Sequence, residues 1–492
     1  MTEPRPPIEL KGTAEHLRGG PAPLPDGFVA RLTSVCSTVT GVEAVAEASR
    51  DWWPLALHWA LAGEVPRRAA VIARPSTTDE VAAVLKACNE NGVPVTPAGG
   101  RSGVCGASVP VFGGVLLDLT ALDALGEVDA VSGVVEAGAG MFGPDLERAI
   151  NEPHGLTIGH FPQSFDIATV GGWVACRGAG QYSTRYGKIE EMVVGLEVVL
   201  ADGRVVRTGG APAAAAGPDL NQVFVGSEGT LGVVTRVWLR AHPVAPARRT
   251  AAFRFGTLSD GFAACRDIIR RGATPAVLRL YDAIESQRGR GGDGTTCALL
   301  VLDEGDTGIV DATMAIVDEV ATRDGVRADP QLVDDWLAHR NDTSALQALT
   351  ERKFVVDTME IAAPWSALDR VYDATTAALL ATPHAIAASC HLSHSYLDGA
   401  CLYFSLAARP PADEIESTYV AMWNAGQRAV LAAGGNLSHH HGVGLNRGRF
   451  MREALGPAFD VLIGLKHSLD PNGILNPGKL GLPSPFGDPA WP

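Results

Sequence analysis

The sequence feature that most constrains the fold is a strand–helix–strand unit that runs directly into a glycine-rich loop. Residues 70–73 are apolar and predict a strand, which Pro75 ends. Thr77 and Glu80 have the Thr-x-x-Glu spacing of a capping box, which marks a helix start. Apolar residues follow at helical spacing, and residues 93–96 predict the next strand. That strand leads into Pro97-Ala-Gly-Gly-Arg-Ser-Gly103, a turn whose backbone amides can hold a phosphate.

Three glycine-bearing segments are candidates for binding an anionic cofactor. The first is residues 97–103, the second is residues 163–172 with its continuation at 176–179, and the third is residues 226–232. Glycine lets a backbone approach a pyrophosphate without a Cβ clash, and successive amides can form an anion nest. Each segment alone could be an ordinary turn. Their order and spacing favour a shared ligand.

A fourth glycine motif, Gly-Ala-Gly-Met-Phe-Gly at residues 138–143, matches the G-x-G-x-x-G fingerprint of dinucleotide-binding folds. It lies well past the first strands, and no acidic residue about 20 positions later clearly closes a second strand. We interpret it as a tight strand-to-helix turn.

Several motifs together resemble the vanillyl-alcohol-oxidase/p-cresol-methylhydroxylase (PCMH) superfamily, and within it the alkylglycerone-phosphate synthase family. They are the three glycine segments, Thr169-Val-Gly-Gly-Trp173, Tyr186-Gly-x-Ile-Glu190, Asp398-Gly-Ala-Cys-Leu-Tyr-Phe404 and Leu437-Ser-His-His-His-Gly-Val-Gly444. The similarity runs from about Arg68 to Lys479. It implies an α+β protein with a PCMH-type, two-subdomain FAD-binding domain and an α+β cap domain for the substrate.

The resemblance also implies which residues contact FAD. They are Pro97, Ala98, Gly99, Gly100, Arg101, Ser102, Gly103, Gln163, Ser164, Asp166, Thr169, Cys176, Arg177, Ala179, Glu228, Gly229, Thr230, Gly232, Val233 and Val234. Relatives that tether the flavin covalently often do so through a histidine in the first loop. This loop has Arg101 and Ser102 instead, so we predict non-covalent FAD. Cys105 is the alternative attachment point for the flavin. It can equally be a small buried thiol that only packs in the core.

Three consecutive histidines, His439, His440 and His441, are the most specific part of the resemblance. Side chains alternate along an extended segment, so at most two of them can serve one site. In the synthase family this run lines the substrate side of the flavin, and the proton-transfer tyrosine corresponds to Tyr403. A phenol can act as general acid or base when its surroundings tune its pKa. We therefore predict that Tyr403 and the three histidines are catalytic.

A metal site is an alternative use of the histidines upstream. D-2-hydroxyacid dehydrogenases of the superfamily bind a metal there, and His391, His394 and Asp398 are candidates because imidazole and carboxylate suit a divalent ion. In this sequence, Tyr403 stands at the position where that pattern has a further metal ligand downstream. We therefore predict no metal.

The sequence departs from the synthase pattern at an arginine that contacts the substrate. Counting back from Thr358-Met-Glu-Ile-Ala-Ala-Pro-Trp365 places Leu346 at that position, although a gap would allow Arg340, Arg352 or Lys353. Leucine cannot replace a guanidinium in bidentate anion recognition. A lysine that often follows the histidine run is Leu445 here, whereas Arg447 is retained.

These features favour a FAD-dependent oxidoreductase that oxidises a small hydroxyl- or amine-bearing substrate by hydride transfer to flavin N5. The alternatives are an alkylglycerone-phosphate synthase-like transferase that forms ether lipids without net redox, a D-2-hydroxyacid dehydrogenase-like enzyme, and a flavin-binding protein without catalysis.

Length and composition set the domain and partner expectations. We predict an N-terminal lead at 1–50, a FAD-binding domain at 51–245, a cap domain at 246–435, and a C-terminal segment, 436–492, that returns to the flavin. With 40 Lys+Arg against 55 Asp+Glu, the net charge of −15 disfavours nucleic acid as a partner. Eight cysteines without a CxxC motif and no long apolar run predict a cytoplasmic protein without a membrane span, and a homodimer is possible.

Overall fold

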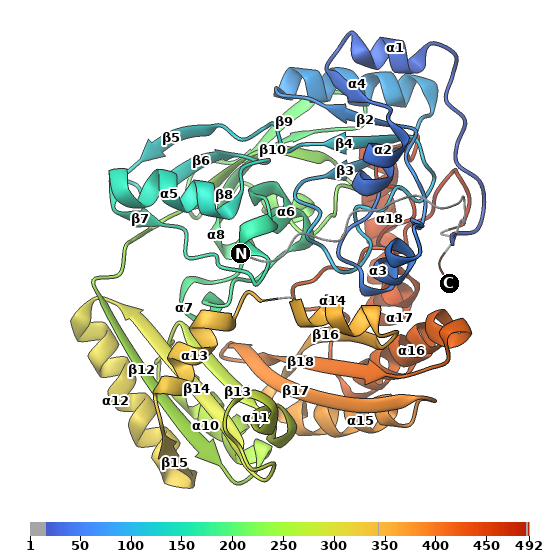
Figure 1. Ribbon diagram of the computed structural model, residues 1–492. Coiled ribbons are helices and arrows are strands. Elements are labelled where there is room, and N and C mark those ends of the chain that lie inside the picture. Colours follow the sequence, from blue (N-terminus) through green and yellow to red (C-terminus); the bar gives the residue numbers. More distant parts are fainter. Residues whose placement is uncertain (1–15, 343, 489–490, 492) are drawn as a thin grey trace.

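The chain folds into two halves, which lie one above the other in Figure 1. The computed structural model describes residues 16–342, 344–488 and 491. In the upper half of Figure 1 lie two small sheets built from residues before 241, and in the lower half lies one large sheet built from residues 247–408. Helices near the C-terminus run alongside both halves (Figure 1). We call the upper part the flavin half and the lower part the cap half.

The first sheet contains the strand–helix–strand unit expected from the sequence. Its order is β1-β2-β4-β3, with β2, β4 and β3 parallel and β1 antiparallel. The Thr77 side chain accepts from the Glu80 amide at 3.2 Å at the start of α4, and Gly92 ends that helix with φ 61°. The elements are α1 (Phe28–Thr33), β1 (Ser37–Val39), α2 (Val42–Ala48), α3 (Pro54–Leu61), β2 (Val71–Arg74), α4 (Thr78–Asn91), β3 (Val95–Ala98) and β4 (Val115–Asp118).

The second sheet is antiparallel, in the order β5-β6-β10-β8-β9, and β7 pairs separately with β11. Its central strand, β10, begins directly after the third glycine segment, at Val233 and Val234, which the sequence analysis treats only as cofactor contacts. The elements are β5 (Leu125–Asp129), β6 (Val134–Gly138), α5 (Gly143–His154), β7 (Leu156–Thr157), η1 (Phe165–Ile167), α6 (Val170–Cys176), α7 (Ser183–Tyr186), α8 (Ile189–Met192), β8 (Val193–Val199), β9 (Val205–Gly209), α9 (Asn221–Phe224), β10 (Val233–Arg240) and β11 (His242–Pro243).

The turn predicted at residues 138–143 connects β6 to α5, and close packing explains its glycines. A Cβ on Gly140 would lie 2.1 Å from the Leu119 carbonyl oxygen. One on Gly143 would lie 2.6 Å from the Phe165 ring. No side chain larger than hydrogen fits at either position without moving its neighbour.

The cap half contains a seven-stranded sheet in the order β15-β12-β14-β13-β17-β18-β16. Its strands alternate between an apolar face under helices and a more polar face. Leu280, for example, contacts the backbone of α10, where a Cβ on Gly261 would lie 2.5 Å from it. Neighbouring Arg279 points the other way, as period-2 alternation requires. The strands are β12 (Ala247–Phe255), β13 (Val277–Tyr281), β14 (Cys297–Gly305), β15 (Gly325–Ala328), β16 (Val355–Pro364), β17 (Ala385–Ser395) and β18 (Gly399–Ala408).

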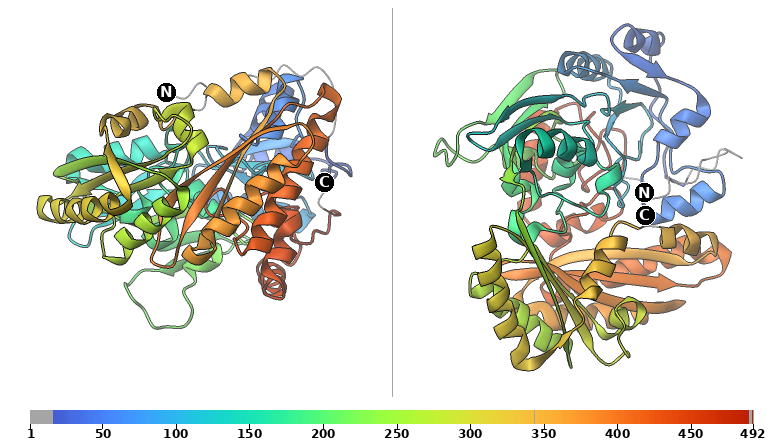
Figure 2. Two further views of the ribbon diagram at one scale, coloured as in Figure 1. Left: turned by 90° about the horizontal axis from the view of Figure 1, so that it is seen from below. Right: turned by 60° about the vertical axis from the view of Figure 1, so that its left-hand side comes forward.

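Helices cover the outer side of this sheet, and the two views of Figure 2 show them on the side away from the flavin half. The remaining elements are α10 (Leu258–Arg270), α11 (Ala283–Gly289), α12 (Thr307–Asp324), α13 (Gln331–His339), α14 (Ser344–Glu351), η2 (Trp365–Ala367), α15 (Leu368–Leu380), η3 (Ala412–Glu414), α16 (Ile415–Ala433), η4 (Gly448–Phe450), α17 (Met451–Leu455) and α18 (Ala458–Leu469).

The last part of the chain returns to the flavin half and is fastened there by buried polar contacts. Lys466 in α18 donates to the Thr230 carbonyl at 2.8 Å and to the Leu475 carbonyl at 2.7 Å. The Val95 amide donates to Ile474 at 2.8 Å, and the Asn476 amide donates back to Val95 at 2.7 Å. These contacts tie residues 466–476 to the first sheet.

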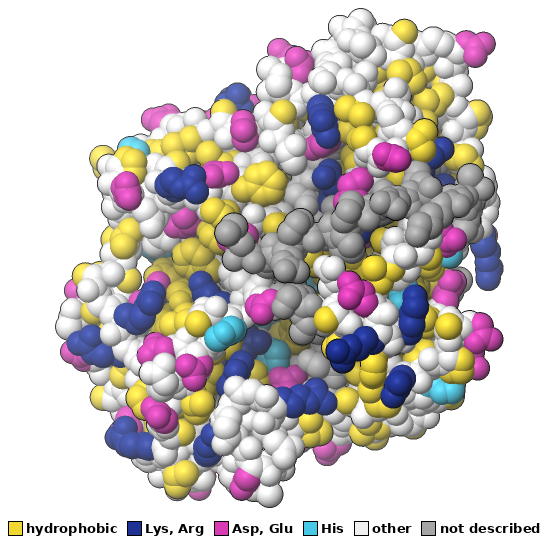
Figure 3. Space-filling view, viewed as in Figure 1, with side chains coloured by type: hydrophobic (Ala, Val, Ile, Leu, Met, Phe, Trp, Pro, Cys, Tyr) yellow, Lys and Arg dark blue, Asp and Glu magenta, His cyan; other side chains and the backbone are white. Residues whose placement is uncertain are grey.

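The surface carries both signs of charge. On the face shown in Figure 3, Asp and Glu side chains are interspersed with Lys and Arg side chains. Within the part of the chain that the structure describes, no helix has both the length and the apolar character needed to cross a bilayer.

Candidate active site

A cavity of about 500 Å³ lies where the two halves meet. Its walls come from the glycine segments of the flavin half and from strands β13, β16, β17 and β18 of the cap half. This volume is in the range of small-molecule and cofactor sites. The cavity therefore brings together motifs that are separated along the chain.

Most of the residues predicted to contact the cofactor line this cavity. They are Pro97, Ala98, Gly99, Gly100, Arg101, Ser102, Gly103, Gln163, Ser164, Thr169, Cys176, Ala179, Glu228, Gly229, Gly232, Val233 and Val234. Three others lie outside its lining. Asp166 is exposed on η1, Arg177 pairs with Glu190 at 3.2 Å on the surface, and Thr230 is buried with its hydroxyl donating to the Ser227 carbonyl at 2.7 Å.

The first glycine loop lies so close to a neighbouring segment that side chains cannot fit there. A Cβ on Gly99 would lie 2.2 Å from the Thr169 hydroxyl oxygen, and one on Gly100 would lie 1.9 Å from the Ile167 carbonyl oxygen. Arg101 follows in the left-handed region with φ 54°, and its buried Nε has no hydrogen-bond partner among the described residues. The guanidinium also forms an ion pair with Asp118, with its Nη1 3.8 Å from the carboxylate. Glycines without side chains and a guanidinium nitrogen without a hydrogen-bond partner fit the pyrophosphate of a dinucleotide such as FAD.

Glu228, in the third glycine segment, uses its carboxylate to hold another loop. Its two oxygens accept from the backbone amides of Val443 at 2.6 Å and Gly444 at 2.8 Å. Burial raises the pKa of Glu228 to about 7, against the lowering effect of these two donors. The third glycine segment is thus fastened to the loop that follows the histidine run.

The thiol considered as a covalent attachment point is buried away from the cavity lining. The sulfur of Cys105 lies 3.8 Å from the Gly442 carbonyl oxygen, and burial raises the pKa of the thiol well above its usual value. It is therefore a poor nucleophile in this environment. The thiol that does line the cavity is that of Cys176, whose pKa burial also raises, to about 12.

Tyr403 lies on the cap wall of the cavity, in β18. Its hydroxyl donates to the Thr358 hydroxyl at 3.1 Å, and its ring stacks on His391 with centroids 4.8 Å apart. Burial raises the pKa of the phenol well above its ordinary value. Tyr403 is therefore protonated at neutral pH, and its hydroxyl is a hydrogen-bond donor.

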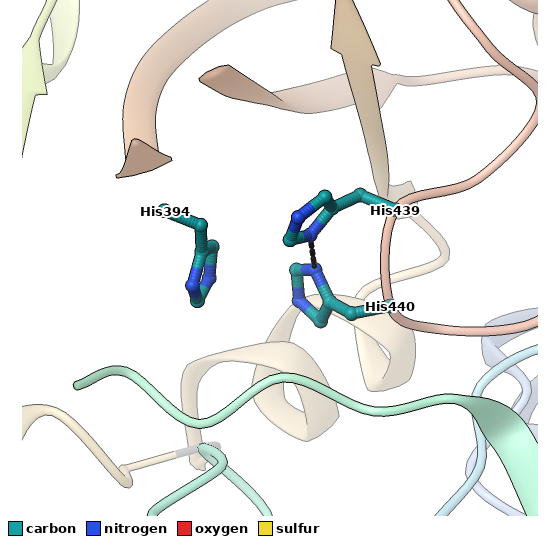
Figure 4. Close-up of side chains that lie close together, drawn as sticks. All are labelled: His394, His439 and His440. Atoms are coloured by element: carbon teal, nitrogen blue, oxygen red, sulfur yellow. Dashed lines mark hydrogen bonds between the residues drawn. The ribbon is translucent and has the colours of Figure 1, made fainter. Parts of the chain in front are cut away.

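The three consecutive histidines divide between two environments. The rings of His439 and His440 meet that of His394, with ligand-type nitrogens of all three within 4.8 Å of one another (Figure 4). His441 instead lies against Glu360, with its Nδ1 2.9 Å from the carboxylate. Of the run, His440 and His441 line the cavity.

The His394, His439 and His440 imidazoles are neutral and held in place. Burial is the main cause that lowers the pKa of each ring well below its usual value. A neighbouring histidine adds to this effect at His394 and His440, and Lys188 adds to it at His439. The Ser183 hydroxyl lies 2.6 Å from His394 Nδ1, and the Tyr396 hydroxyl lies 2.7 Å from His439 Nε2. Neutral imidazoles accept protons or bind divalent ions. The absence of a metal stays a prediction.

A buried ion pair shapes the histidine run from behind. Glu360 in β16 pairs with Arg447, and both side chains are fully buried. Its Oε1 also accepts from the amides of His440 at 3.1 Å and His441 at 2.8 Å. Burial alone would raise the pKa of Glu360, but Arg447 and the nearby histidines hold it well below its usual range. A permanent anion thus holds consecutive backbone amides of the run, from which His440 and His441 reach the cavity.

The metal candidates His391, His394 and Asp398 do not come together. His391 lies between Glu285, at 2.8 Å from its Nδ1, and Arg279, at 2.6 Å from its Nε2. Asp398 is exposed at the turn between β17 and β18. Burial and Arg279 lower the pKa of His391 to about 4, so its ring is neutral, donating to Glu285 and accepting from Arg279.

Sequence reasoning missed several cavity residues. His160 is fully buried beside the ring of Trp173, burial lowers its pKa to about 3, and neither ring nitrogen has a hydrogen-bond partner among the described residues. A lone histidine outside any motif gives no signal in one sequence. The cavity residue Arg279 likewise has a visible role only through its contact with His391, which in turn contacts Glu285, 106 residues away in the sequence.

Comparisons with known proteins match both halves. Residues 69–209 match the model of an FAD binding domain, and residues 244–480 match that of the C-terminal domain of FAD linked oxidases. The uncharacterized FAD-linked oxidoreductase YgcU of Escherichia coli (strain K12) is 33% identical over 84% of this chain and 88% of its own length. The chain belongs to the FAD-linked oxidases. It binds FAD and is an FAD-dependent oxidoreductase.

Other members of this family extend the range of similar proteins. Alkyldihydroxyacetonephosphate synthase of Dictyostelium discoideum is 28% identical over 85% of this chain and 74% of its own length. The glycolate oxidase subunit GlcD of Bacillus subtilis (strain 168) is also 28% identical, over 84% of this chain and 88% of that protein.

Solved structures have the same fold. An alkyldihydroxyacetonephosphate synthase structure covers 94% of this chain and 87% of its own at a TM-score of 0.76 and 23% identity. A p-cresol methylhydroxylase structure covers 94% of this chain and 98% of its own at a TM-score of 0.74 and 18% identity. The predicted α+β, PCMH-type fold and the predicted FAD cofactor are confirmed.

Proposed function

We propose that this FAD-linked oxidase oxidises a small hydroxyl- or amine-bearing substrate by hydride transfer to N5 of non-covalently bound FAD. The proposal depends on the composition of the cavity. The glycine loops expected to bind the cofactor form one wall, and Tyr403 and the neutral His440 lie on the other. When bound, FAD supplies the hydride acceptor, and the protein supplies position and proton transfer.

The cap wall is suited to orient the heteroatom of the substrate and its proton. His440 is neutral and lines the cavity, so its ring can accept a hydrogen bond from the O–H or N–H of the substrate. Tyr403 is protonated and can donate a hydrogen bond to the substrate heteroatom. Its hydroxyl is already oriented by Thr358, and its ring by stacking on His391. His439 positions His440 through the 2.8 Å contact between their Nδ1 atoms.

A second candidate function is the exchange of acyl for alkoxy groups by a synthase-like transferase without net redox. The triple histidine and Tyr403 in one cavity support it, as does the similarity to alkyldihydroxyacetonephosphate synthases. Leu346 weighs against it, because it lines the cavity at the position that the synthase pattern gives to a substrate-contacting arginine. A D-2-hydroxyacid dehydrogenase-like activity is a special case of the first proposal.

Anaerobic mixing of the FAD-loaded protein with a panel of 2-hydroxy acids, alcohols and amines tests the proposal. We expect at least one class to bleach the flavin absorption band. Failure across the whole panel, together with an ether product formed from acyl-dihydroxyacetone phosphate and a fatty alcohol, would contradict oxidation and favour the transferase.

A further inference from the structure

We propose that His394 and His440 are the two ends of one proton relay, which takes up the proton of a substrate hydroxyl at one imidazole and releases a proton from the other. Both imidazoles line the cavity, with ring centroids 5.0 Å apart. Three residues outside the cavity lining, Ser183, Tyr396 and His439, connect them. The inference rests on the proposed function and narrows it, because it names a hydroxyl as the group that is oxidised.

The relay is a chain of four hydrogen bonds that begins at His440 and ends at His394. The Nδ1 atoms of His440 and His439 lie 2.8 Å apart (Figure 4). His439 Nε2 lies 2.7 Å from the Tyr396 hydroxyl, which also hydrogen-bonds to Ser183. The Ser183 hydroxyl lies 2.6 Å from His394 Nδ1. Each neighbouring pair shares one hydrogen, so the direction of one hydrogen bond fixes the direction of all four.

The two ends of the chain present opposite groups to the cavity. Nε2 of His394 and Nε2 of His440 form no hydrogen bond with any residue that the structure describes. A neutral imidazole has one N–H and one lone pair. When His440 donates from Nδ1, its Nε2 is an acceptor, and the same direction of the chain leaves an N–H on Nε2 of His394. Reversing the chain exchanges the two roles, so the cavity is always offered one donor and one acceptor.

A hydroxyl group matches this pair of imidazoles. It donates one hydrogen bond to Nε2 of His440 and accepts another from the N–H of His394. A carboxylate offers only acceptors and an ammonium group only donors, so each would leave one imidazole without a partner. An unsatisfied polar group is costly in a buried site. The arrangement therefore favours an alcohol over a protonated amine as the reacting group.

A coordinated shift of the chain leaves every member neutral. The O–H bond of the substrate breaks and its proton binds Nε2 of His440, while the hydride of the neighbouring carbon passes to FAD. His440 gives its Nδ1 proton to His439, which gives its Nε2 proton to Tyr396. Tyr396 and Ser183 each pass one proton on, and His394 releases its Nε2 proton to solvent water. The product is a carbonyl compound, and proton exchange with water at both ends returns the chain to its first direction.

The surroundings favour a relay of neutral groups. Burial lowers the pKa of all three imidazoles well below its usual value. Lys188 adds to this effect at His439, whose carbonyl oxygen accepts from the lysine Nζ at 2.8 Å. An imidazolium is therefore costly here, whereas the coordinated shift creates none. Both nitrogens of His439 belong to the chain, so a metal ion could bind this ring only by displacing Tyr396 or His440.

Tyr396→Phe and Ser183→Ala each remove one link of the chain and keep the groups that line the cavity. The probe is the alcohol or 2-hydroxy acid that reduces the flavin fastest. At saturating probe we expect both variants to slow flavin reduction about tenfold or more, because the outlet for the proton is lost. Tyr372→Phe is the matched control, since the Tyr372 hydroxyl lies 3.3 Å from Asp282 and outside the cavity lining, and it should react as the wild type does. FAD affinity should stay within about twofold of the wild type in all three variants.

The number of protons that move together separates a relay from a structural role. The rate of flavin reduction is measured in mixtures of H₂O and D₂O. Several coupled protons should give the wild type a curved dependence on the D₂O fraction, and Tyr396→Phe should give a straight line. A straight line for the wild type, or unchanged rates in both variants, would overturn the relay. So would a slow Tyr396→Phe variant whose curve is as bowed as that of the wild type, because its loss would then be structural.

A second measurement needs no turnover. Nitrogen NMR spectra of the FAD-loaded protein with ¹⁵N-labelled histidine report which ring nitrogens carry hydrogen. Between about pH 6 and 8 we expect three neutral rings, with His394 and His439 in the same tautomer and His440 in the other. A protonated ring, a bound metal ion, or His440 in the tautomer of His439 would overturn the relay. If no compound of the panel reduces the flavin, the proposed function fails while these spectra still test the relay, so the two failures are distinguishable.

Discussion

The two walls of the cavity are built on opposite principles. The flavin wall consists largely of backbone and small side chains, and at Gly99 and Gly100 even a methyl group would collide with residues 167–169. The cap wall consists of aromatic and ionisable side chains, among them Arg279 and Tyr403, and His391 contacts both of them from behind the wall. A wall of backbone suits a cofactor that is always the same. A wall of side chains can be changed residue by residue, which suits recognition of the substrate.

The largest expected effect of a single substitution is at the ion pair behind the histidine run. Glu360→Gln leaves Arg447 buried without its counter-ion, so we expect a loss of about 3–5 kcal/mol in the free energy of unfolding. Urea titration of the FAD-loaded protein measures it. Glu319→Gln is the control, because Glu319 forms exposed pairs with Arg271 and Arg323, whose loss should destabilise the fold far less. Equal losses for the two variants would contradict the role assigned to Glu360.

On the cap wall, Tyr403→Phe tests the chemistry directly. The substitution removes one hydroxyl and keeps the ring that stacks on His391. We expect flavin reduction by substrate to slow about 10²-fold, with FAD affinity unchanged. Stopped-flow absorbance at the flavin band gives the rate. An unchanged rate would reduce Tyr403 to a packing residue.

On the flavin wall, Gly100→Ala should weaken FAD binding. Its Cβ would lie 1.9 Å from the Ile167 carbonyl oxygen, so the loop must move. Such overpacking costs about 1–3 kcal/mol, and we expect FAD affinity to fall about tenfold or more. Fluorescence titration of the apoprotein with FAD measures it. Gly256→Ala is the control because no atom lies within 4 Å of its added Cβ, and it should bind FAD normally.

Two buried neutral histidines should make stability depend on pH. His160 lines the cavity, and His391 contacts Arg279 and Tyr403 from behind the cap wall. Burial lowers the pKa of His160 to about 3, and burial with Arg279 lowers that of His391 to about 4, whereas both titrate near 6.5 when unfolded. Between pH 6.5 and 4 the unfolded state therefore binds more protons. The free energy of unfolding should fall as pH falls through this window.

His160→Gln and His391→Gln should each make this fall shallower by on the order of 1 kcal/mol. Thermal or urea unfolding at pH 6.5, 5.5 and 4.5 measures the slope. His154→Gln, at an exposed position, should leave it unchanged. Identical slopes in all variants would show that these two imidazoles are not the groups that become protonated on unfolding.

The smallest expected effect is that of metal removal. We predict a protein without a bound metal, although His394, His439 and His440 lie close together (Figure 4). Dialysis against EDTA should therefore leave the rate of flavin reduction unchanged. A loss of rate that zinc or manganese restores would contradict the prediction and assign the three imidazoles to an ion.

The two walls also differ in how much of them the sequence could predict. Glycines are required where a backbone must approach closely, so the loop at 97–103 and the segment at 226–232 are visible as patterns. The structure places most of their residues on the cavity. Tyr403 and the histidine run were visible only through resemblance to a family. On the flavin wall, the Glu228 carboxylate accepts from the Val443 and Gly444 amides, and no local sequence pattern specifies this tertiary contact.

The contacts of the cap wall could not be predicted from the sequence, and the reason is physical. His391 acquires its role from Glu285 and Arg279, which belong to α11 and β13, whereas His391 belongs to β17. Such groups meet only when the seven strands take their order. Strands β16 and β17 also contain polar residues at buried positions, such as Asp357, Glu360 and His394. Functional polarity on a buried face weakens the apolar pattern by which a strand is recognised.

Paired titrations of Gly100→Ala and Arg340→Gln test the division between the two walls most directly. FAD affinity is measured first, and the rate of flavin reduction is then followed at saturating FAD as the substrate concentration is varied. We predict that Gly100→Ala weakens FAD binding but, once loaded, uses substrate as the wild type does. Arg340→Gln should keep its FAD affinity and require at least tenfold more substrate. An Arg340→Gln variant that loses FAD, or a loaded Gly100→Ala variant that needs more substrate, would contradict the division.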